Sequence, residues 1–110
     1  MKRNVNFTQI LSFHCDNPEA VVQLAAAWDD MQAAADIMGY MGSHVLAHRD
    51  RPGEYKIVAE FGVVDPDVSA ADEAMKNNDR PETQLWAQKL QDIIHGEPSY
   101  DNYDEIYRTG

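Results

Sequence analysis

The chain has 110 residues, with 9 basic and 19 acidic side chains and a formal net charge of −10 at pH 7. This length and a hydrophobic content of 44% predict one folded domain, residues 1–110, around a single core. The charge disfavours nucleic acid and anionic membranes as partners, and no apolar stretch could span a bilayer, so we expect a soluble, cytoplasmic protein.

The first predicted element is a strand over residues 5–15. One face is strongly apolar, with Gln9 as its exception, and the other face is mixed and includes His14. An imidazole titrates near neutral pH, so His14 is a candidate base for a phenol or quinol; the alternative is a structural role or a dimer contact. Cys15 is the only cysteine, which excludes a disulfide within the chain and a thiolate metal cluster.

A long helix is predicted next. Asp16-Asn17-Pro18-Glu19 is a helix-start pattern, and the helix should run to about Met38, with Gly39 ending it. Its apolar stripe consists of Val21, Leu24, Ala25, Trp28, Met31, Ala35 and Met38. The polar residues expected on its solvated side are Asp29, Asp30, Gln32 and Asp36.

A hairpin should follow, with strands over residues 40–49 and 54–61. The turn Arg51-Pro52-Gly53-Glu54 has the proline and glycine positions of type II. His44 and His48 share one face of the first strand, and at roughly 3.3 Å per residue they lie about 13 Å apart, too far to chelate one ion. We therefore predict no metal site, and we keep His44 as a second candidate base.

Two helical segments are predicted after the hairpin. Ser69 can cap a short helix that ends near Asn77. Asp79 should then cap a second helix, with Pro81 in its first turn and Gly96 closing it in a left-handed conformation. The stripe of this second helix comprises Trp86, Leu90, Ile93 and Ile94, with Thr83 and Ala87 beside them.

The last predicted element is a strand over residues 99–108, with a bulge near Asn102. The order strand, helix, strand, strand, helix, strand is that of the ferredoxin-like split βαβ fold, an α+β fold with an antiparallel sheet and helices on one face. Large apolar residues also occur on the uncovered face. We therefore expect a homodimer whose sheets pack together, because a second copy would cover that face most simply.

With this order, the chain resembles the antibiotic biosynthesis monooxygenase-like family of the dimeric α+β barrel superfamily. The resemblance is carried by residues 39–49 after the long helix, the hairpin 50–55, Ala59-Glu60-Phe61, and residues 72–78 and 81–83. It implies a homodimer with a pocket between helices and sheet in each subunit. Members include oxygenases that act on quinols or polycyclic aromatics without metal or flavin, and enzymes that degrade haem.

The residues of the haem-degrading branch are not kept. That branch uses an Asn on the first strand, a Trp at the end of the third strand and a His early in the second helical segment. Leu11 or Ser12, Phe61 and Asn78 stand at these positions here. The resemblance therefore does not extend to haem degradation.

Two functions remain open. The first is a monooxygenase without metal or other cofactor, acting on a small aromatic or quinol, with His14 or His44 as base and Asn78 positioning the substrate. The second is a non-catalytic ligand-binding or structural homodimer. The residues expected to wall the pocket are Trp28, Phe61 and Trp86, although tryptophans on inner helix faces more often only fill the core, and Asn78 can equally be a turn residue.

Overall fold

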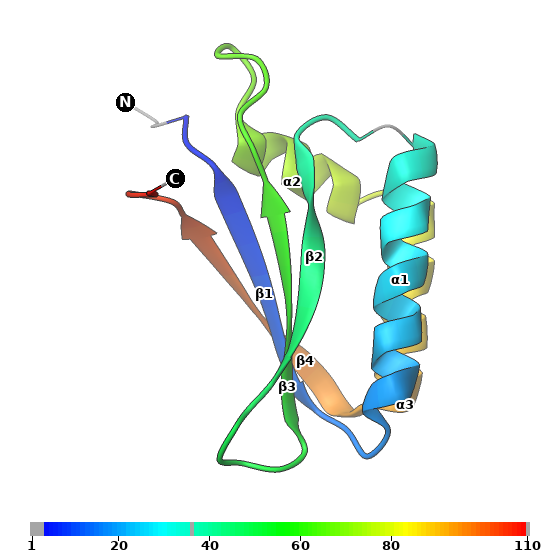
Figure 1. The fold of residues 1–110 in the computed structure, drawn as a ribbon. Coiled ribbons are helices and arrows are strands. Elements are labelled where there is room, and N and C mark those ends of the chain that lie inside the picture. Colours follow the sequence, from blue (N-terminus) through cyan, green and yellow to red (C-terminus); the bar gives the residue numbers. More distant parts are fainter. Residues whose placement is uncertain (1–3, 36, 110) are drawn as a thin grey trace.

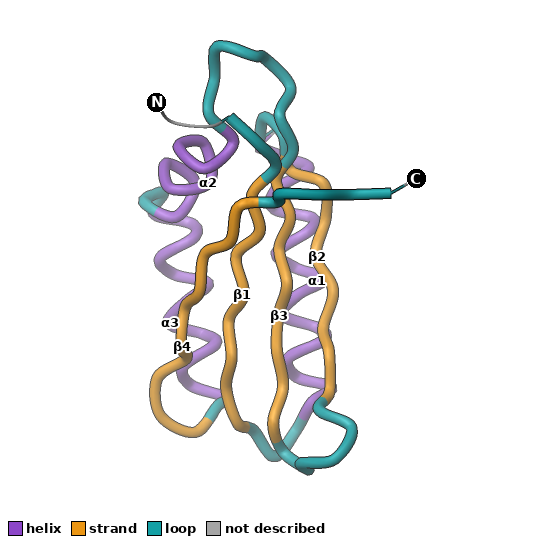
Figure 2. Tube along the Cα trace, turned by 90° about the vertical axis from the view of Figure 1, so that its left-hand side faces the viewer, coloured by secondary structure: helices purple, strands orange, loops and turns teal. Residues whose placement is uncertain are grey.

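The computed structural model describes residues 4–35 and 37–109 and shows a four-stranded antiparallel sheet with its helices on one face (Figure 1). The strand order is β2-β3-β1-β4, seen from the uncovered face in Figure 2. The elements are β1 (Phe7–His14), α1 (Pro18–Ala35), β2 (Tyr40–Ala47), β3 (Glu54–Phe61), α2 (Ala70–Asn78), α3 (Pro81–Ile93) and β4 (His95–Asp104). The predicted ferredoxin-like α+β fold is confirmed.

The central strand β1 has the predicted phase. Its apolar side chains and Gln9 are buried under the helices, whereas Thr8, Ile10 and Ser12 are half-buried on the opposite face. Because successive side chains of a strand point to opposite faces, this one phase decides which residues of every paired strand face the helices. We call the helix-covered face the inner face and the other the outer face.

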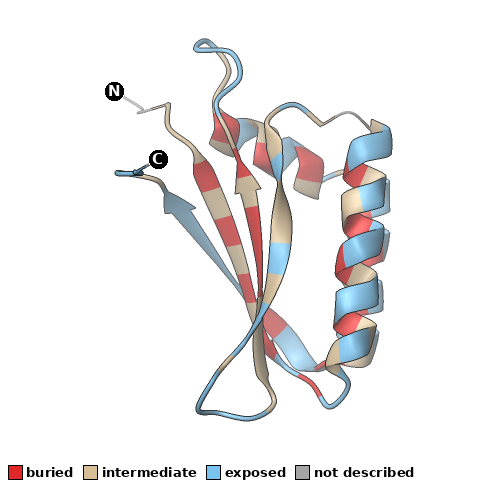
Figure 3. Cartoon of the chain, viewed as in Figure 1, coloured by how far each residue is buried: buried red, intermediate tan, exposed pale blue. Residues whose placement is uncertain are grey.

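The core consists of two clusters between the inner face and the helices (Figure 3). The larger cluster joins Leu11 and Ile57 of the sheet to α1 and α3, and Leu90 of α3 is fully buried in it. The smaller cluster packs Phe7 and Phe61 under the short helix α2. None of the described helices is long and apolar enough to cross a membrane.

Two expectations for α1 are wrong. Gln32, expected on the solvated side, is 1% exposed, because it lies four residues after Trp28 on the same helix face. Its Oε1 accepts a hydrogen bond of 2.8 Å from Asn77 Nδ2, which compensates part of the burial of both amides. Met38, expected in the stripe, is 45% exposed beyond the end of the helix. The prediction for Asp36 lies outside the described residues.

The boundary between α2 and α3 differs from the prediction. Ser69 caps α2 as predicted, since its hydroxyl accepts from the Asp72 N–H at 3.2 Å. Asp79, however, caps the end of α2 with its backbone N–H instead of starting α3. Arg80 precedes α3 without a side-chain capping bond, and Pro81 opens the helix as predicted.

The last strand begins earlier than predicted. Helix α3 ends at Ile93, and Ile94 is already extended, so β4 starts at His95 instead of Ser99. The irregularity in its pairing lies where residues 95–99 stand opposite residues 12–14, not near Asn102. Gly96, with φ +72°, therefore serves the irregular start of β4 and does not close the helix.

The hairpin between β2 and β3 is confirmed. Strand β3 has the predicted bounds, Glu54–Phe61, and β2 ends two residues earlier than expected, at Ala47. In the turn, the Glu54 N–H donates to the Arg51 carbonyl at 3.3 Å, and Gly53 has a φ of +87°. These are the features of the type II turn.

The connection between α1 and β2 lies very close to the end of β3, and Gly39 stands at the point of closest approach. Its φ is +82°, and a Cβ there would stand 2.4 Å from the Gly62 carbonyl oxygen. Gly39→Ala should lower the free energy of unfolding by about 1–2 kcal/mol for the left-handed backbone and by about 1–3 kcal/mol more for the clash.

The matched control is Gly96→Ala, which has φ +72° and open space around the added Cβ. It should show only the backbone cost in urea unfolding followed by circular dichroism. Equal losses for the two variants would contradict the close approach at Gly39.

Candidate functional site

A cavity of about 390 Å³ lies between the inner sheet face and the helices. Its floor is formed by β1, β3 and the middle of β4, and its wall by α1, the last residue of α2 and α3. Nearly all lining side chains are apolar, aromatic or amide-bearing. They are Gln9, Leu11, Trp28, Ile57, Ala59, Asn78, Thr83, Gln84, Trp86, Ala87, Gln91 and Tyr100.

Two indole rings form the aromatic part of the wall. The ring centroids of Trp28 and Trp86 are 4.9 Å apart, with a tilt of 52° between the planes. Trp86 Nε1 donates a hydrogen bond of 2.8 Å to the Leu24 carbonyl of α1, so its polar atom is already satisfied by the protein. The ring surfaces that remain are suited to stacking with a flat apolar ligand.

The polar part of the lining is uncharged. Gln9 Nε2 donates to Asn102 Oδ1 at 3.2 Å, and Gln84 Nε2 donates to the Asn78 carbonyl at 2.7 Å. The hydroxyl oxygen of Thr83 is buried and has no hydrogen-bond partner within the described residues. Amides and a hydroxyl are groups that bind carbonyl and hydroxyl oxygens of a neutral ligand.

Tyr100 is the only residue with an ionisable side chain among the residues that line this cavity. It lies on the inner face because it pairs with Leu11 of β1. Burial, and secondarily the negative charge of Glu97, raise the pKa of the Tyr100 phenol. At neutral pH its O–H is therefore a hydrogen-bond donor and not a base.

The structure brings together three of the six residues predicted for the site. Trp28, Trp86 and Asn78 all line the cavity. Phe61 does not: it is fully buried in the smaller core cluster, where its ring packs against Phe7 and Tyr40 at centroid distances of 6.4 and 5.6 Å.

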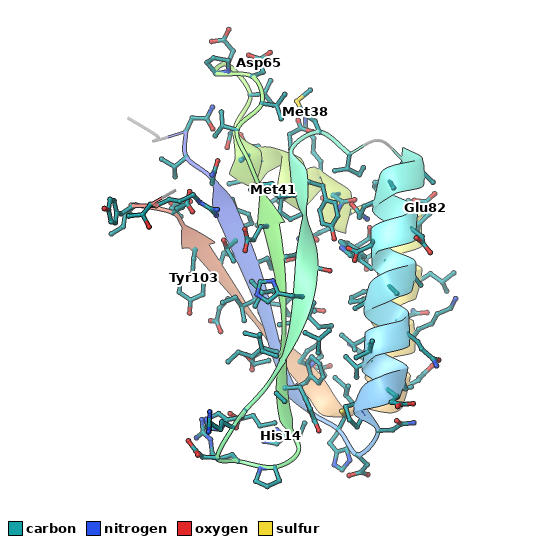
Figure 4. All side chains as sticks on the ribbon, viewed as in Figure 1. His14, Met38, Met41, Asp65, Glu82 and Tyr103 are labelled. Atoms are coloured by element: carbon teal, nitrogen blue, oxygen red, sulfur yellow. The ribbon has the colours of Figure 1, made fainter. Side chains whose placement is uncertain are left out.

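The two candidate histidines lie on the outer face. His14 has a side chain that is 64% exposed, with Nε2 3.5 Å from a Glu54 carboxylate oxygen, and Figure 4 shows it at the lower end of the sheet. His44 is exposed on β2 opposite Val58, whose neighbours Ile57 and Ala59 face the cavity. Across residues 4–35 and 37–109, no group of three or more His, Cys, Asp or Glu side chains could hold a metal ion.

Sequence reasoning did not select Gln9, Thr83 or Tyr100 for the site. Gln9 did carry a signal, because it is the one polar residue in the apolar phase of β1. A buried amide in the middle of an apolar strand face suggests a polar ligand or a polar neighbour. Tyr100 carried no such signal, since its face depends on the register between β4 and β1.

A second polar cluster supports the wall behind Trp28. The carboxylate of its neighbour Asp29 accepts hydrogen bonds from the Tyr40 hydroxyl and from Ser43 Oγ, which ties α1 to β2. Burial, followed by the interaction with Asp29, raises the pKa of Tyr40, against smaller opposing contributions from Ser43 and Trp28. Tyr40 therefore stays protonated well above the pH at which a free tyrosine ionises.

The fold matches solved structures of oxygenases at low sequence identity. SnoaB, a cofactor-independent oxygenase from Streptomyces nogalater, matches with a TM-score of 0.71 and 14% identity, over 94% of this chain and 96% of SnoaB. A provisionally named antibiotic biosynthesis monooxygenase from Nitrosomonas europaea matches with a TM-score of 0.66 and 13% identity, over 100% and 99%. A similarly named protein from Caulobacter crescentus matches with a TM-score of 0.66 and 10% identity, over 94% of this chain and 92% of that protein.

No protein-family model matches the sequence, and no curated protein matches it. At identities of 10–14%, the matches establish a shared fold. The resemblance expected from the sequence is confirmed at that level.

The raised pKa of Tyr40 predicts a pH dependence of stability. In the unfolded chain Tyr40 ionises near pH 10, whereas in the folded protein it stays protonated at that pH. The contribution of Tyr40 to the free energy of unfolding is therefore complete below pH 10 and is lost as the pH rises toward the folded pKa. Tyr40→Phe should lower the free energy of unfolding by about 1 kcal/mol at pH 7. The difference from wild type should shrink as the pH rises above 10, by up to about 1.4 kcal/mol per pH unit.

Urea unfolding at a series of pH values measures this difference. Ser43→Ala is the control, because it removes the other hydrogen bond to Asp29 without removing a titrating group. An identical pH slope in wild type and Tyr40→Phe would contradict the assignment.

Proposed function

We propose that this chain is a cofactor-independent oxygenase that oxidises a small, uncharged aromatic or quinol-type substrate in the cavity. The observation that carries the proposal is the aromatic wall, where the indoles of Trp28 and Trp86 meet at 4.9 Å over a largely apolar space of about 390 Å³. The fold shared with SnoaB supports the same reaction class.

The proposed chemistry takes its electrons from the substrate. With anthrone, for example, the ring CH₂ group loses two hydrogens, one atom of O₂ becomes the new carbonyl oxygen, and the other leaves as water with both hydrogens. The indoles would hold the ring, and Asn78 and Tyr100 would donate hydrogen bonds to an oxygen on the substrate. His14 and His44 take no part, because they lie on the other sheet face.

A non-catalytic binding module is the second candidate. The observation that favours it is the absence of an imidazole or carboxylate among the residues that line the cavity. Such a cavity can bind an aromatic ligand, which both candidate functions require. Its lining holds no side chain that would accept a proton from that ligand at neutral pH.

We also propose that a second copy covers the outer sheet face. Ile10 and Val58 lie at its centre, and Leu46 and Tyr103 are 46% and 53% exposed on the strands to either side. Figure 4 shows Tyr103 pointing away from the helices. An apolar centre with a polar rim that includes Ser12, Lys56 and Glu60 is the composition of a protein interface.

Oxygen consumption tests the enzymatic proposal. The wild-type protein should accelerate O₂ uptake with anthrone or a quinol, and Asn78→Ala should slow it about tenfold, because one oriented hydrogen bond to the reacting oxygen is removed. His14→Ala and His44→Ala should leave the rate within about twofold.

The same assay separates the two candidates. Binding of these compounds without acceleration would identify a binding module, and a tenfold loss in either histidine variant would place the reacting groups outside the cavity.

The oligomeric state tests the proposed interface. Light scattering at micromolar concentration should give twice the mass of the chain, and Leu46→Asp should shift the protein toward the monomer because it places a charge in the contact. Leu85→Asp, at an exposed site on α3, is the control. A monomeric wild type at this concentration would refute the dimer.

A further inference from the structure

The Thr83 hydroxyl is the one side-chain group of the cavity wall that is deeply buried and unpaired. Thr83 is 7% exposed, it lines the cavity, and its Oγ1 has no hydrogen-bond partner within the described residues. A buried hydroxyl without a partner costs stability, so its presence in a native structure requires an explanation.

The neighbouring polar groups do not supply the missing partner. Gln9 is engaged with Asn102, and Gln84 with the Asn78 carbonyl. The other buried unpaired atoms, on Gln32 and Asn77, belong to residues that bond to each other and do not line the cavity. Among the described residues, Thr83 alone therefore combines a fully buried polar atom that lacks a partner with a place in the cavity lining.

The position of Thr83 on α3 fits a ligand that also touches the indoles. Trp86 lies three residues further along the same helix face, where Cβ atoms are about 5–6 Å apart. One ligand can therefore touch the indole of Trp86 and the side chain of Thr83 at the same time. A threonine in a helix has two accessible χ1 rotamers, so its hydroxyl can turn toward an oxygen of that ligand without strain.

We propose that Thr83 anchors the ligand, with its hydroxyl donating a hydrogen bond to a carbonyl or hydroxyl oxygen on the edge of an uncharged aromatic ring that lies against Trp86 and Trp28. This inference rests on the proposed function of the cavity and narrows its ligand class. None of the basic residues in the described part of the chain lines the cavity, so an anionic substituent gains no ionic partner among them. Thr83 thus favours oxygen-bearing aromatics over hydrocarbons, and the uncharged lining favours neutral ligands over anions.

Intrinsic fluorescence provides the test, because both tryptophans of the chain line the cavity. Three probes separate ring contacts from the anchoring bond: 1-tetralone, a neutral aryl ketone; tetralin, the same skeleton without oxygen; and naphthalene-2-sulfonate, an anion. Wild-type protein should bind 1-tetralone about tenfold more tightly than tetralin, as expected for one buried hydrogen bond, and naphthalene-2-sulfonate most weakly.

Thr83→Val keeps the shape of the side chain and removes the hydroxyl. It should weaken 1-tetralone binding about tenfold and leave tetralin within about twofold, while Thr83→Ser should retain the preference for the ketone. The urea midpoint of Thr83→Val should equal or exceed that of wild type, because an unpaired hydroxyl is removed. Thr8→Val, on the outer face of β1, should change neither affinity.

The outcomes separate this inference from the proposed function. If wild type binds 1-tetralone and Thr83→Val changes both affinities equally or not at all, the anchor is refuted and the cavity proposal stands. If Thr83→Val unfolds at lower urea, the hydroxyl has a partner in the protein, and the anchor is refuted as well. If wild type binds none of the probes, the proposed function of the cavity falls and the anchor falls with it.

Discussion

The contact between Trp28 and Trp86 is the interaction on which the cavity depends. It places two large rings where α1 and α3 meet above the sheet, and the bond from Trp86 Nε1 to the Leu24 carbonyl ties the α3 ring to the α1 backbone. Below the rings, the sheet presents Ala59, and α3 presents Ala87. Large residues at the helix contact with small ones around it leave a space that the chain itself does not fill.

The charge distribution separates the surface from the cavity. The chain carries 19 acidic residues, and none of those within residues 4–35 and 37–109 lines the cavity. Asp29, beside Trp28, points toward β2, and its carboxylate accepts hydrogen bonds there from the hydroxyls of Tyr40 and Ser43. The acidic surface repels anions, and the cavity lining has no positive charge to bind one. The surface and the cavity therefore both favour a neutral ligand.

Periodicity in the sequence was sufficient for most of the fold, because one buried face leaves a strong pattern in β1, α1, β3 and α3. Periodicity did not predict the burial of residues or the ends of elements that depend on contacts between distant parts of the chain. Gln32 lies on the buried face of α1, where Asn77 supplies a partner from another helix, and Asp79 ends α2 because the chain turns directly into α3. The start of β4 at His95 depends on its pairing with His14, which no local pattern reveals.

The site was harder to predict than the fold for a related reason. Alternation correctly separated His14 from Leu11, but the face that carries a cavity is decided by where the helices pack. Histidines stand out in the sequence because their side chains titrate near neutral pH. The lining residues Gln9 and Thr83 have common side chains, and only their burial beside a cavity is unusual. Burial of a polar side chain on an apolar face is therefore the more informative signal in this fold.

The absence of a base in the cavity restricts how the protein could accelerate an oxidation. A donor such as the Tyr100 phenol, held protonated by its raised pKa, stabilises negative charge on a substrate oxygen and so lowers the pKa of the substrate itself. A substrate whose C–H or O–H proton is already acidic can then lose it to water at the cavity mouth. The proposed oxygenase therefore requires a substrate that forms a delocalised anion, which flat, oxygen-bearing aromatic rings do.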